Sequence, residues 1–176
     1  MTVDERLIRP AAPADLDAVA AIYTHYVRHT VSTFEETPPP VEHWHLRLAD
    51  LAARGLPFLV AEAAGRVVGY AYAAPWRPKP AYRHTAENSV YLDPGHTGRG
   101  HGTALLAALI DDCARAGLRQ LVAVVADPGN DASVTLHRRL GFTEAGRLTA
   151  VGHKHGRWLD TLLLQRPLGA PDRPRP

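Results

Sequence analysis

The sequence predicts a mixed α/β layer fold built as one domain. Four segments carry apolar residues at helical spacing, and seven short apolar runs between them have the length and composition of strands. Glycine or proline stands at most boundaries between these segments, where one element ends and the next begins. The expected order along the chain is β-α-α-β-β-β-α-β-α-β-β.

The first quarter of the chain is expected to hold one strand and two helices. Leu7–Arg9 is the candidate first strand. One helix opens at Pro13 and a second follows the three prolines 38–40, because proline is tolerated in a first helical turn. Gly55 ends the second helix. The apolar stripes of the two helices consist of Leu16, Val19, Tyr23 and Val27, and of Val41, Trp44, Leu48 and Leu51.

The rest of the chain alternates strands with two further helices. Leu121–Val125 is rich in β-branched residues, which favours a buried strand, and Gly117 and Gly141 end the two helices. A proline-rich loop, Pro75–Pro80, separates a hairpin from the next strand. The expected strands are Phe58–Ala63, Val67–Ala74, Asn88–Leu92, Leu121–Val125, Glu144–Val151 and Trp158–Leu164, and the expected helices are Thr103–Ala116 and Ala132–Leu140.

The composition points to a globular protein of the reducing cytosol. The chain has 176 residues, 45% hydrophobic and 22% charged, so we expect one domain over residues 1–167 and a proline-rich tail over 168–176. The single cysteine, Cys113, excludes an internal disulfide. A net charge of +2 with scattered Lys and Arg argues against a nucleic-acid partner. No signal peptide or long apolar run is evident, so we expect a cytoplasmic protein without a membrane partner.

A glycine-rich turn is the most informative motif. Gly98, Gly100 and Gly102 follow a strand and lead directly into a helix, so backbone N–H groups and the helix N-terminus can surround an anion. Arg99 adds a cation, and the expected ligand is a phosphate or pyrophosphate. The spacing fits neither a Walker loop nor a dinucleotide fingerprint. The alternative is a turn that uses glycine only for its tight geometry.

This turn resembles the acetyl-CoA pyrophosphate loop of the GNAT superfamily of N-acetyltransferases. The match is Thr97-Gly-Arg-Gly-His-Gly102, although Thr97 stands where the motif has Gln or Arg. Residues 130–142, which begin with Asn130 and end in Gly-Phe, resemble the second signature of the superfamily. The resemblance implies a mostly antiparallel central sheet flanked by helices, with acetyl-CoA as co-substrate in a cleft between the strands near Val90 and Val124.

A closer resemblance is to the phosphinothricin and methionine sulfoximine N-acetyltransferases. It rests on motifs in the same order over nearly the whole chain: Ser32-Thr-Phe34, Ala74-Pro-Trp76, Ala81-Tyr82, Thr85–Tyr91, Leu136-His137 and His153–Trp158. The resemblance implies direct acetyl transfer to the amine of a small anionic amino acid analogue. It also implies a role in detoxification or herbicide resistance, and a homodimer.

Two residues receive catalytic roles from this resemblance. Glu87 matches the acidic residue that acts as general base on the protonated amine; without the resemblance it would be a solvent-exposed glutamate at a strand end. His137 stands where this subfamily has histidine and most of the superfamily has tyrosine. It either protonates the departing thiolate or packs beside the cofactor without transferring a proton.

The resemblance also assigns binding residues. The expected acetyl-CoA contacts are Val90, Tyr91, Leu92, Gly98, Arg99, Gly100, His101, Gly102, Thr103 and Asn130. An N–H at Leu92 is the candidate for polarising the thioester carbonyl. The expected acceptor contacts are Phe34, Arg77, Lys79, Tyr82, Asn88 and Ser89, with Arg77 and Lys79 as the cations for anionic groups. For Lys79 an ordinary solvated loop position is the alternative.

Two other functions remain open from the sequence. The same fold can serve another amine, such as a protein N-terminus, a lysine or a polyamine, or it can bind acyl-CoA as a sensor without catalysis. A metal enzyme is not expected, because the ten histidines form no recognised ligand set with acidic residues or cysteines.

Overall fold

The structure is a computed structural model that describes residues 6–126 and 131–169. The helices are α1 (Leu16–His29), α2 (Val41–Ala53), α3 (His101–Arg115) and α4 (Asp131–Arg139). The strands are β1 (Leu7–Pro10), β2 (Phe58–Ala63), β3 (Arg66–Pro75), β4 (Thr85–Leu92), β5 (Gln120–Ala126), β6 (Thr143–Lys154) and β7 (Arg157–Pro167). This order confirms the mixed α/β fold.

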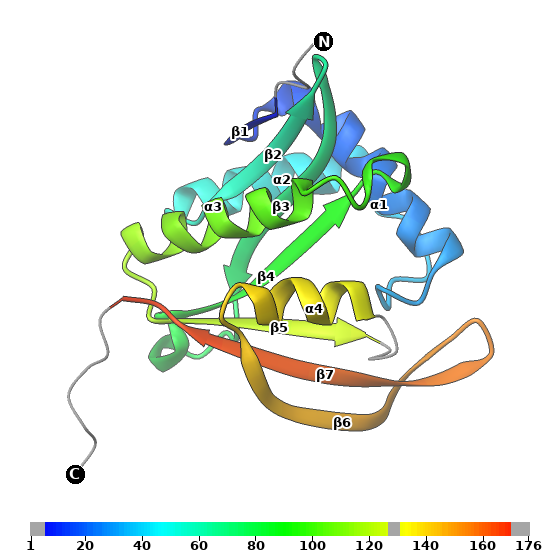
Figure 1. Ribbon diagram of the computed structural model, residues 1–176, viewed down its shortest axis with the longest axis vertical. Coiled ribbons are helices and arrows are strands. Elements are labelled where there is room, and N and C mark those ends of the chain that lie inside the picture. The colour runs from blue at the N-terminus through cyan, green and yellow to red at the C-terminus, as the bar shows by residue number, and fades with distance from the viewer. Residues whose placement is uncertain (1–5, 127–130, 170–176) are drawn as a thin grey trace.

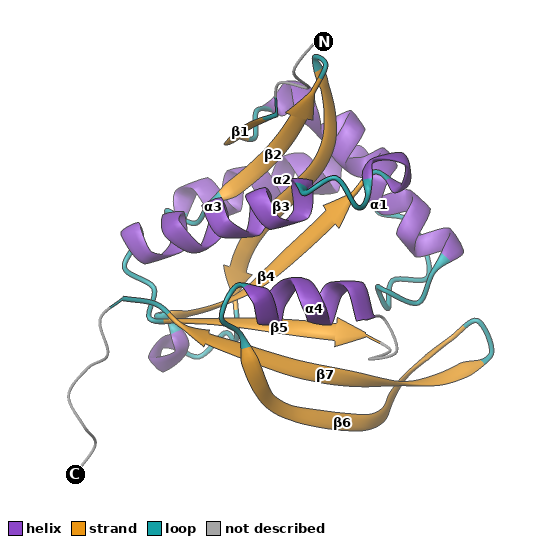
Figure 2. Cartoon of the chain, viewed as in Figure 1, coloured by secondary structure: helices purple, strands orange, loops and turns teal. Residues whose placement is uncertain are grey.

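The seven strands form a single twisted sheet in the order β1-β2-β3-β4-β5-β7-β6. Neighbouring strands are antiparallel everywhere except between β4 and β5, which run parallel. Figure 2 shows β6 and β7 as a long hairpin at one edge of the sheet. The one parallel pair therefore lies in the middle of an otherwise antiparallel sheet.

Helices cover both faces of the sheet (Figure 1). On one face α1 and α2 enclose an aromatic core of Trp44, Phe58, Tyr70 and Tyr72. On the other face α3 packs an aliphatic stripe that includes Leu105, Leu106 and Leu109 against the small side chains of β3. The two cores differ in chemistry because the sheet residues alternate, with tyrosines facing α1 and α2 and alanines facing α3.

Some element boundaries differ from those that the sequence predicts. β4 begins at Thr85 rather than Asn88, because residues from Ala86 onward pair with β3 and Thr85–Glu87 also pair with β5. α3 begins at His101 rather than Thr103, since Gly100 adopts a left-handed conformation (φ 82°) as the residue before the helix. β6 extends to Lys154, three residues past the predicted end. Pairing sets both strand boundaries: β4 pairs with two strands from other parts of the chain, and the end of β6 pairs with β7 across the hairpin turn.

No helix in the described parts of the chain is both long enough and apolar enough to cross a membrane. Nor do residues 6–126 and 131–169 bring together three or more His, Cys, Asp or Glu side chains in a way that would hold a metal ion.

Candidate active site

A cleft opens where the two parallel strands separate. β4 and β5 pair only through Thr85–Glu87 and Gln120–Val122, and beyond these residues the strands diverge. The resulting cleft has a volume of about 850 Å³, within the range of small-molecule sites. Its walls are Glu87–Leu92 of β4, Ala123–Ala126 of β5, Ala132, Ser133, Thr135, Leu136, His137 and Arg139 on the α4 side, Thr97, Gly98, Gly100, Gly102 and Thr103 of the glycine turn, and Tyr26 and Ser32.

The glycine turn forms one end of this cleft. Gly98 and Gly100 have φ values of 72° and 82°, in a region that side chains with a Cβ rarely adopt. Apart from its chain neighbours, no atom of the described residues lies within 4 Å of the position of a Cβ on Gly98, so the backbone is open on that side. The N-terminus of α3 directly follows, and its unpaired N–H groups favour an anion. The turn therefore suits the pyrophosphate of a nucleotide-derived ligand.

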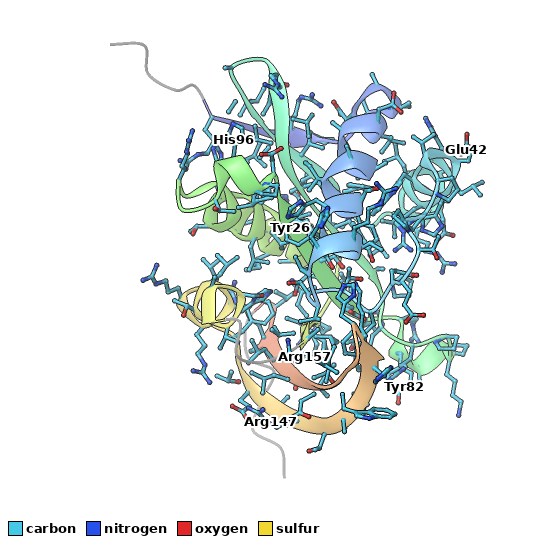
Figure 3. All side chains as sticks on the ribbon, turned by 90° about the vertical axis from the view of Figure 1, so that its right-hand side faces the viewer. Tyr26, Glu42, Tyr82, His96, Arg147 and Arg157 are labelled. Carbon is cyan, nitrogen blue, oxygen red and sulfur yellow. The ribbon has the colours of Figure 1, made fainter. Side chains whose placement is uncertain are left out.

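The wall of β4 carries the groups expected to contact the acyl and pantetheine portions of acetyl-CoA. Val90, Tyr91 and Leu92 all line the cleft. The hydroxyl of Tyr26 donates a hydrogen bond of 2.6 Å to the carbonyl oxygen of Leu92, which ties α1 to the end of β4. Tyr26, at the centre of Figure 3, is a cleft residue that the sequence analysis did not identify.

Glu87 lies on the side of β4 that faces α1 and α2. It stands opposite Ala74 of β3, and Ser89 and Tyr91 share its face because they follow at intervals of two residues. Burial raises the pKa of Glu87, and the nearby cations of Arg77 and Arg47 partly oppose this increase. A carboxylate whose pKa is raised by burial is a suitable proton acceptor for an amine.

Aromatic side chains lie at the end of the cleft that contains Glu87. The Tyr91 ring lies 5.2 Å from that of Tyr23 and 5.1 Å from that of Tyr26. Burial raises the pKa of the Tyr91 phenol, so it stays protonated at neutral pH. Tyr26 and Tyr91 therefore place aromatic surface in the cleft wall that also contains Glu87.

His137 and Asn88 meet on the opposite side of β4. The Nδ1 of His137 lies 2.8 Å from the carbonyl oxygen of Ser133, which can only accept, so the ring proton is on Nδ1. Nε2 then accepts a hydrogen bond of 2.8 Å from the side-chain amide of Asn88. Burial lowers the pKa of His137, so the ring is neutral at neutral pH. Both ring nitrogens are engaged within the protein.

The basic loop residues predicted for substrate binding lie outside the cleft walls. Arg77 is exposed and its guanidinium stacks on Trp76, 4.6 Å from the ring centre, yet its charge still acts on Glu87. Lys79 and Tyr82 are also exposed. Phe34 is 38% exposed and packs on Gly152 of β6. These four side chains are not among the cleft walls, whereas Asn88 and Ser89 are.

Three residues predicted to bind the cofactor, Arg99, His101 and Asn130, are not among the described walls of the cleft. Arg99 is exposed, and its carbonyl oxygen accepts a hydrogen bond of 2.5 Å from Arg6. His101 is only 1% exposed and lies beneath the turn rather than in the cleft wall. Asn130 lies outside the described residues. The glycines of the turn thus line the cleft as predicted, whereas Arg99 and His101 are not among its walls.

Arg47 is a charged residue near the site that sequence reasoning missed. Its Nη1 donates a hydrogen bond of 3.1 Å to the hydroxyl of Tyr72, and its guanidinium lies 5.0 Å from the centre of that ring. Tyr72 stands opposite Ser89, so Arg47 lies one side chain away from the cleft wall. The only sequence signal was a basic residue one turn after Trp44 on the second predicted helix, which does not distinguish it from a surface cation.

Comparisons with known proteins show the family of the chain. Residues 19–142 match the model of the Acetyltransferase (GNAT) family. A phosphinothricin N-acetyltransferase from Alcaligenes faecalis is 49% identical over 165 residues, covering 94% of this chain and 84% of the relative. An L-methionine sulfoximine/L-methionine sulfone acetyltransferase from Pseudomonas aeruginosa is 43% identical over 159 residues, covering 90% of this chain and 92% of the relative.

A solved structure is similar over almost the whole chain. The crystal structure of a GNAT superfamily phosphinothricin acetyltransferase from Sinorhizobium meliloti, in complex with acetyl-CoA, superimposes with a TM-score of 0.91 at 43% sequence identity. The superposition covers 97% of this chain and 92% of that chain.

Proposed function

The chain belongs to the acetyltransferase (GNAT) family and is an acetyl-CoA-dependent N-acetyltransferase, and we propose that its acceptor is the amine of a small anionic amino acid analogue. The relatives named for phosphinothricin and for methionine sulfoximine or sulfone support this substrate class. The observation that carries the proposal is a half-buried carboxylate, Glu87, between a cofactor cleft and two arginines.

Glu87 is proposed as the general base. An amino acid amine is largely protonated at neutral pH and cannot attack a carbonyl until it loses a proton. Glu87 takes that proton, directly or through one water, and its raised pKa makes the transfer more favourable than to an exposed glutamate. Acetyl-CoA supplies the activated acetyl group, and direct attack of the amine gives an N-acetyl product and the CoA thiol.

His137 is proposed to pack beside the cofactor without giving up a proton. Its Nδ1–H is bonded to Ser133, its Nε2 accepts from Asn88, and burial lowers its pKa. A neutral ring bonded in this way has no proton directed at the leaving sulfur. The departing thiolate, with a pKa near that of a cysteine thiol, about 8.5, can leave without an acid.

The glycine turn and β4 are proposed to bind acetyl-CoA. The left-handed backbone of Gly98 and Gly100, which is open beside Gly98, and the N-terminus of α3 that follows it fit a pyrophosphate. Thr103 and Gly102 continue this wall, and Val90–Leu92 extend it toward Glu87. Arg99, His101 and Asn130 keep their proposed cofactor roles by resemblance alone.

The acceptor site is proposed to select an anionic substrate. The charges of Arg77 and Arg47 both act on the region of Glu87, and a guanidinium matches the geometry of a carboxylate or phosphinate. Lys79 extends this positive potential from the same loop as Arg77. Ser89 of the cleft wall, with Phe34 and Tyr82 at its border, would shape the pocket for the rest of the substrate.

Further properties are proposed from the relatives rather than from the site. Acetylation removes the charge of the amine, which would detoxify an amino acid analogue that mimics a natural one. We also propose a cytoplasmic homodimer, and a domain over residues 1–167 with a short proline-rich tail. Sedimentation of the purified protein tests the dimer directly.

The experiment that tests the substrate class is a panel of acceptors. Thiol release from acetyl-CoA is measured with phosphinothricin, methionine sulfoximine, methionine sulfone, a lysine peptide and a polyamine. Rapid release with the first three, and little with the last two, is the expected result. Release only with the peptide or polyamine would overturn the substrate class. Binding of acetyl-CoA without release for any amine would instead indicate a sensor.

A further inference from the structure

A buried lysine joins the edge of the sheet to the loop between α1 and α2. Lys154, the last residue of β6, is only 2% exposed. Its Nζ donates a hydrogen bond of 2.8 Å to the carbonyl oxygen of Thr33. Burying an ammonium group is costly, so a buried lysine without a catalytic role calls for another explanation. Glu35 and Glu36 of the same loop attract it electrostatically.

Gly152 makes a second contact between β6 and this loop. The ring of Phe34 lies so close that a Cβ on Gly152 would stand 2.3 to 2.8 Å from three of its carbons. Such distances are far below van der Waals contact. Gly152 does not have a positive φ, so its backbone conformation does not require glycine. Space for Phe34 is therefore the reason for glycine at this position.

A bulge directs this end of β6 toward the loop. The pairing jumps from Leu148 opposite Thr161 to Gly152 opposite Leu159, so three residues of β6 face one residue of β7. Ala150, within the bulge, has a φ of 51°, and its N–H donates a hydrogen bond of 2.8 Å to the carboxylate of Asp160. Bulges bend a strand and change where its side chains point. In Figures 1 and 3 the outer part of the β6–β7 hairpin lies beneath the end of α1.

The loop that β6 holds leads directly to the acceptor end of the cleft. Ser32 lines the cleft together with Glu87 and Ser89. The hydroxyl of Thr33 lies 2.7 Å from that of Tyr23, whose ring contacts Tyr91. Any movement of Thr33 or Phe34 would therefore displace Ser32 and the aromatic wall beside Glu87.

We propose that Lys154 and Gly152 are positioning residues that fix the Ser32–Phe34 segment and so determine which acceptors the cleft admits. Neither residue is a catalytic residue, because both act through the loop. The bulge in β6 brings Gly152 under the Phe34 ring and Lys154 under the Thr33 carbonyl. This inference rests on the proposed function, because it assumes that the acceptor binds beside Glu87.

The test uses two variants and a control on the same strand. Gly152→Ala forces Phe34 away, and Lys154→Met removes the ammonium but keeps the length of the side chain. Gly146→Ala is the control, since nothing lies within 4 Å of its Cβ position and its φ is not positive. KM and kcat for each acceptor, the Kd of acetyl-CoA, and hydrogen exchange of peptides covering residues 30–37 are measured for all four proteins.

Positioning predicts a selective effect. Gly152→Ala and Lys154→Met should raise the acceptor KM about tenfold, as expected for a displaced wall of the acceptor site, with kcat and the Kd of acetyl-CoA within about threefold. Exchange of residues 30–37 should be faster than in the wild type and in Gly146→Ala. In a Phe34→Ala background, Gly152→Ala should have no further effect on KM, because the clash is gone.

Two outcomes would overturn the inference. One is unchanged exchange of residues 30–37 in both variants, which means that β6 does not hold the loop. The other is faster exchange with acceptor KM and selectivity equal to those of the wild type, which means that the loop does not shape the acceptor site. Failure of the proposed function is distinct, because the wild type itself would then acetylate none of the anionic analogues. Exchange remains informative in that case, and KM is then measured on whichever amine the wild type acetylates.

Discussion

The two sides of β4 have opposite chemistry at the point where the sheet opens. Glu87, Ser89 and Tyr91 face α1 and α2, among tyrosines and the charges of Arg47 and Arg77. Asn88, Val90 and Leu92 face α3 and α4, where the neighbours are aliphatic residues and the neutral ring of His137. One strand of eight residues therefore presents a face with a carboxylate and a face without charged groups to the same cleft.

This difference separates two tasks that an acetyltransferase must perform together. Binding of a large anionic cofactor requires backbone donors and little else, which the glycine turn provides. Deprotonation of an ammonium group is favoured by a carboxylate with a raised pKa. Burial raises that pKa, whereas nearby cations lower it. Because adjacent residues of a strand point to opposite faces, we expect substitution of Glu87 and substitution of the glycine turn to affect different tasks.

The largest expected effect is on the acceptor face. Glu87→Gln keeps the shape of the side chain but cannot accept a proton. Turnover with an amino acid acceptor should fall by about 10²- to 10⁴-fold, the usual contribution of general base catalysis. The Kd of acetyl-CoA, measured by titration calorimetry, should stay within about twofold of wild type, since Glu87 is not among the residues proposed to bind the cofactor. Equal losses in both quantities would contradict the separation of faces.

A second substitution addresses the cofactor face. Gly100→Ala places a side chain at a φ of 82°, beside the Arg6 guanidinium. We expect acetyl-CoA to bind about tenfold more weakly, because a left-handed alanine costs about 1–2 kcal/mol and distorts the turn. Gly117→Ala is the matched control, with a φ of 84° and no atom within 4 Å of its Cβ position. If both variants weaken binding equally, the effect is on stability and not on the cofactor site.

Substitutions of His137 should have an intermediate effect on turnover, and they distinguish hydrogen bonding by this residue from proton transfer. His137→Gln removes the titrating group but keeps an acceptor for the Asn88 amide, whereas His137→Phe leaves that amide unpaired. Turnover should fall less than about threefold in the first variant and about tenfold in the second, the cost of one buried unsatisfied donor. Steady-state kinetics on both proteins check this. A large, equal loss in the two variants would instead indicate that His137 supplies a proton.

The smallest expected effect is a shift in pH dependence. Glu87 must be ionised to accept a proton, so kcat/KM should fall as the pH drops through its raised pKa. Arg77→Gln removes a cation that favours the carboxylate, so it should raise the pKa of Glu87 further and move the acid limb to higher pH. Arg83→Gln, at an exposed position near the same loop, should leave that limb in place. A shift of the acid limb toward lower pH in Arg77→Gln would contradict this prediction.

The sequence predicted most of the fold because local patterns decide it. The stripe around Leu105 and Leu109 and the glycines at 117 and 141 identify helices and their ends without any tertiary information. The start of β4 at Thr85 was missed, because its two pairing partners, β3 and β5, come from segments on either side in the sequence. Local composition does not encode such pairing.

The site was predictable only where a motif carries it. The turn at Gly98–Gly102 follows from the need for open backbone, and it lies at the cleft. Arg47 could not be identified in this way, because its contact with Tyr72 joins residues far apart in the sequence. Lys154 lies within the recognised motif His153–Trp158, but its contact with Thr33 does not follow from that motif. Ser32 belonged to a recognised motif, but its place in the cleft depends on the loop held by β6.

The most direct test of Glu87 as the general base is the pH dependence of the rate deficit, the loss of acetyl-transfer rate in Glu87→Gln relative to wild type. The rate of acetyl transfer to methionine sulfoximine is compared between wild type and Glu87→Gln from acid to alkaline pH, at saturating acetyl-CoA. If Glu87 removes the amine proton, the deficit should shrink as the pH approaches the pKa of the substrate amine, because solvent then performs the same deprotonation. A deficit of constant size at every pH would contradict the account.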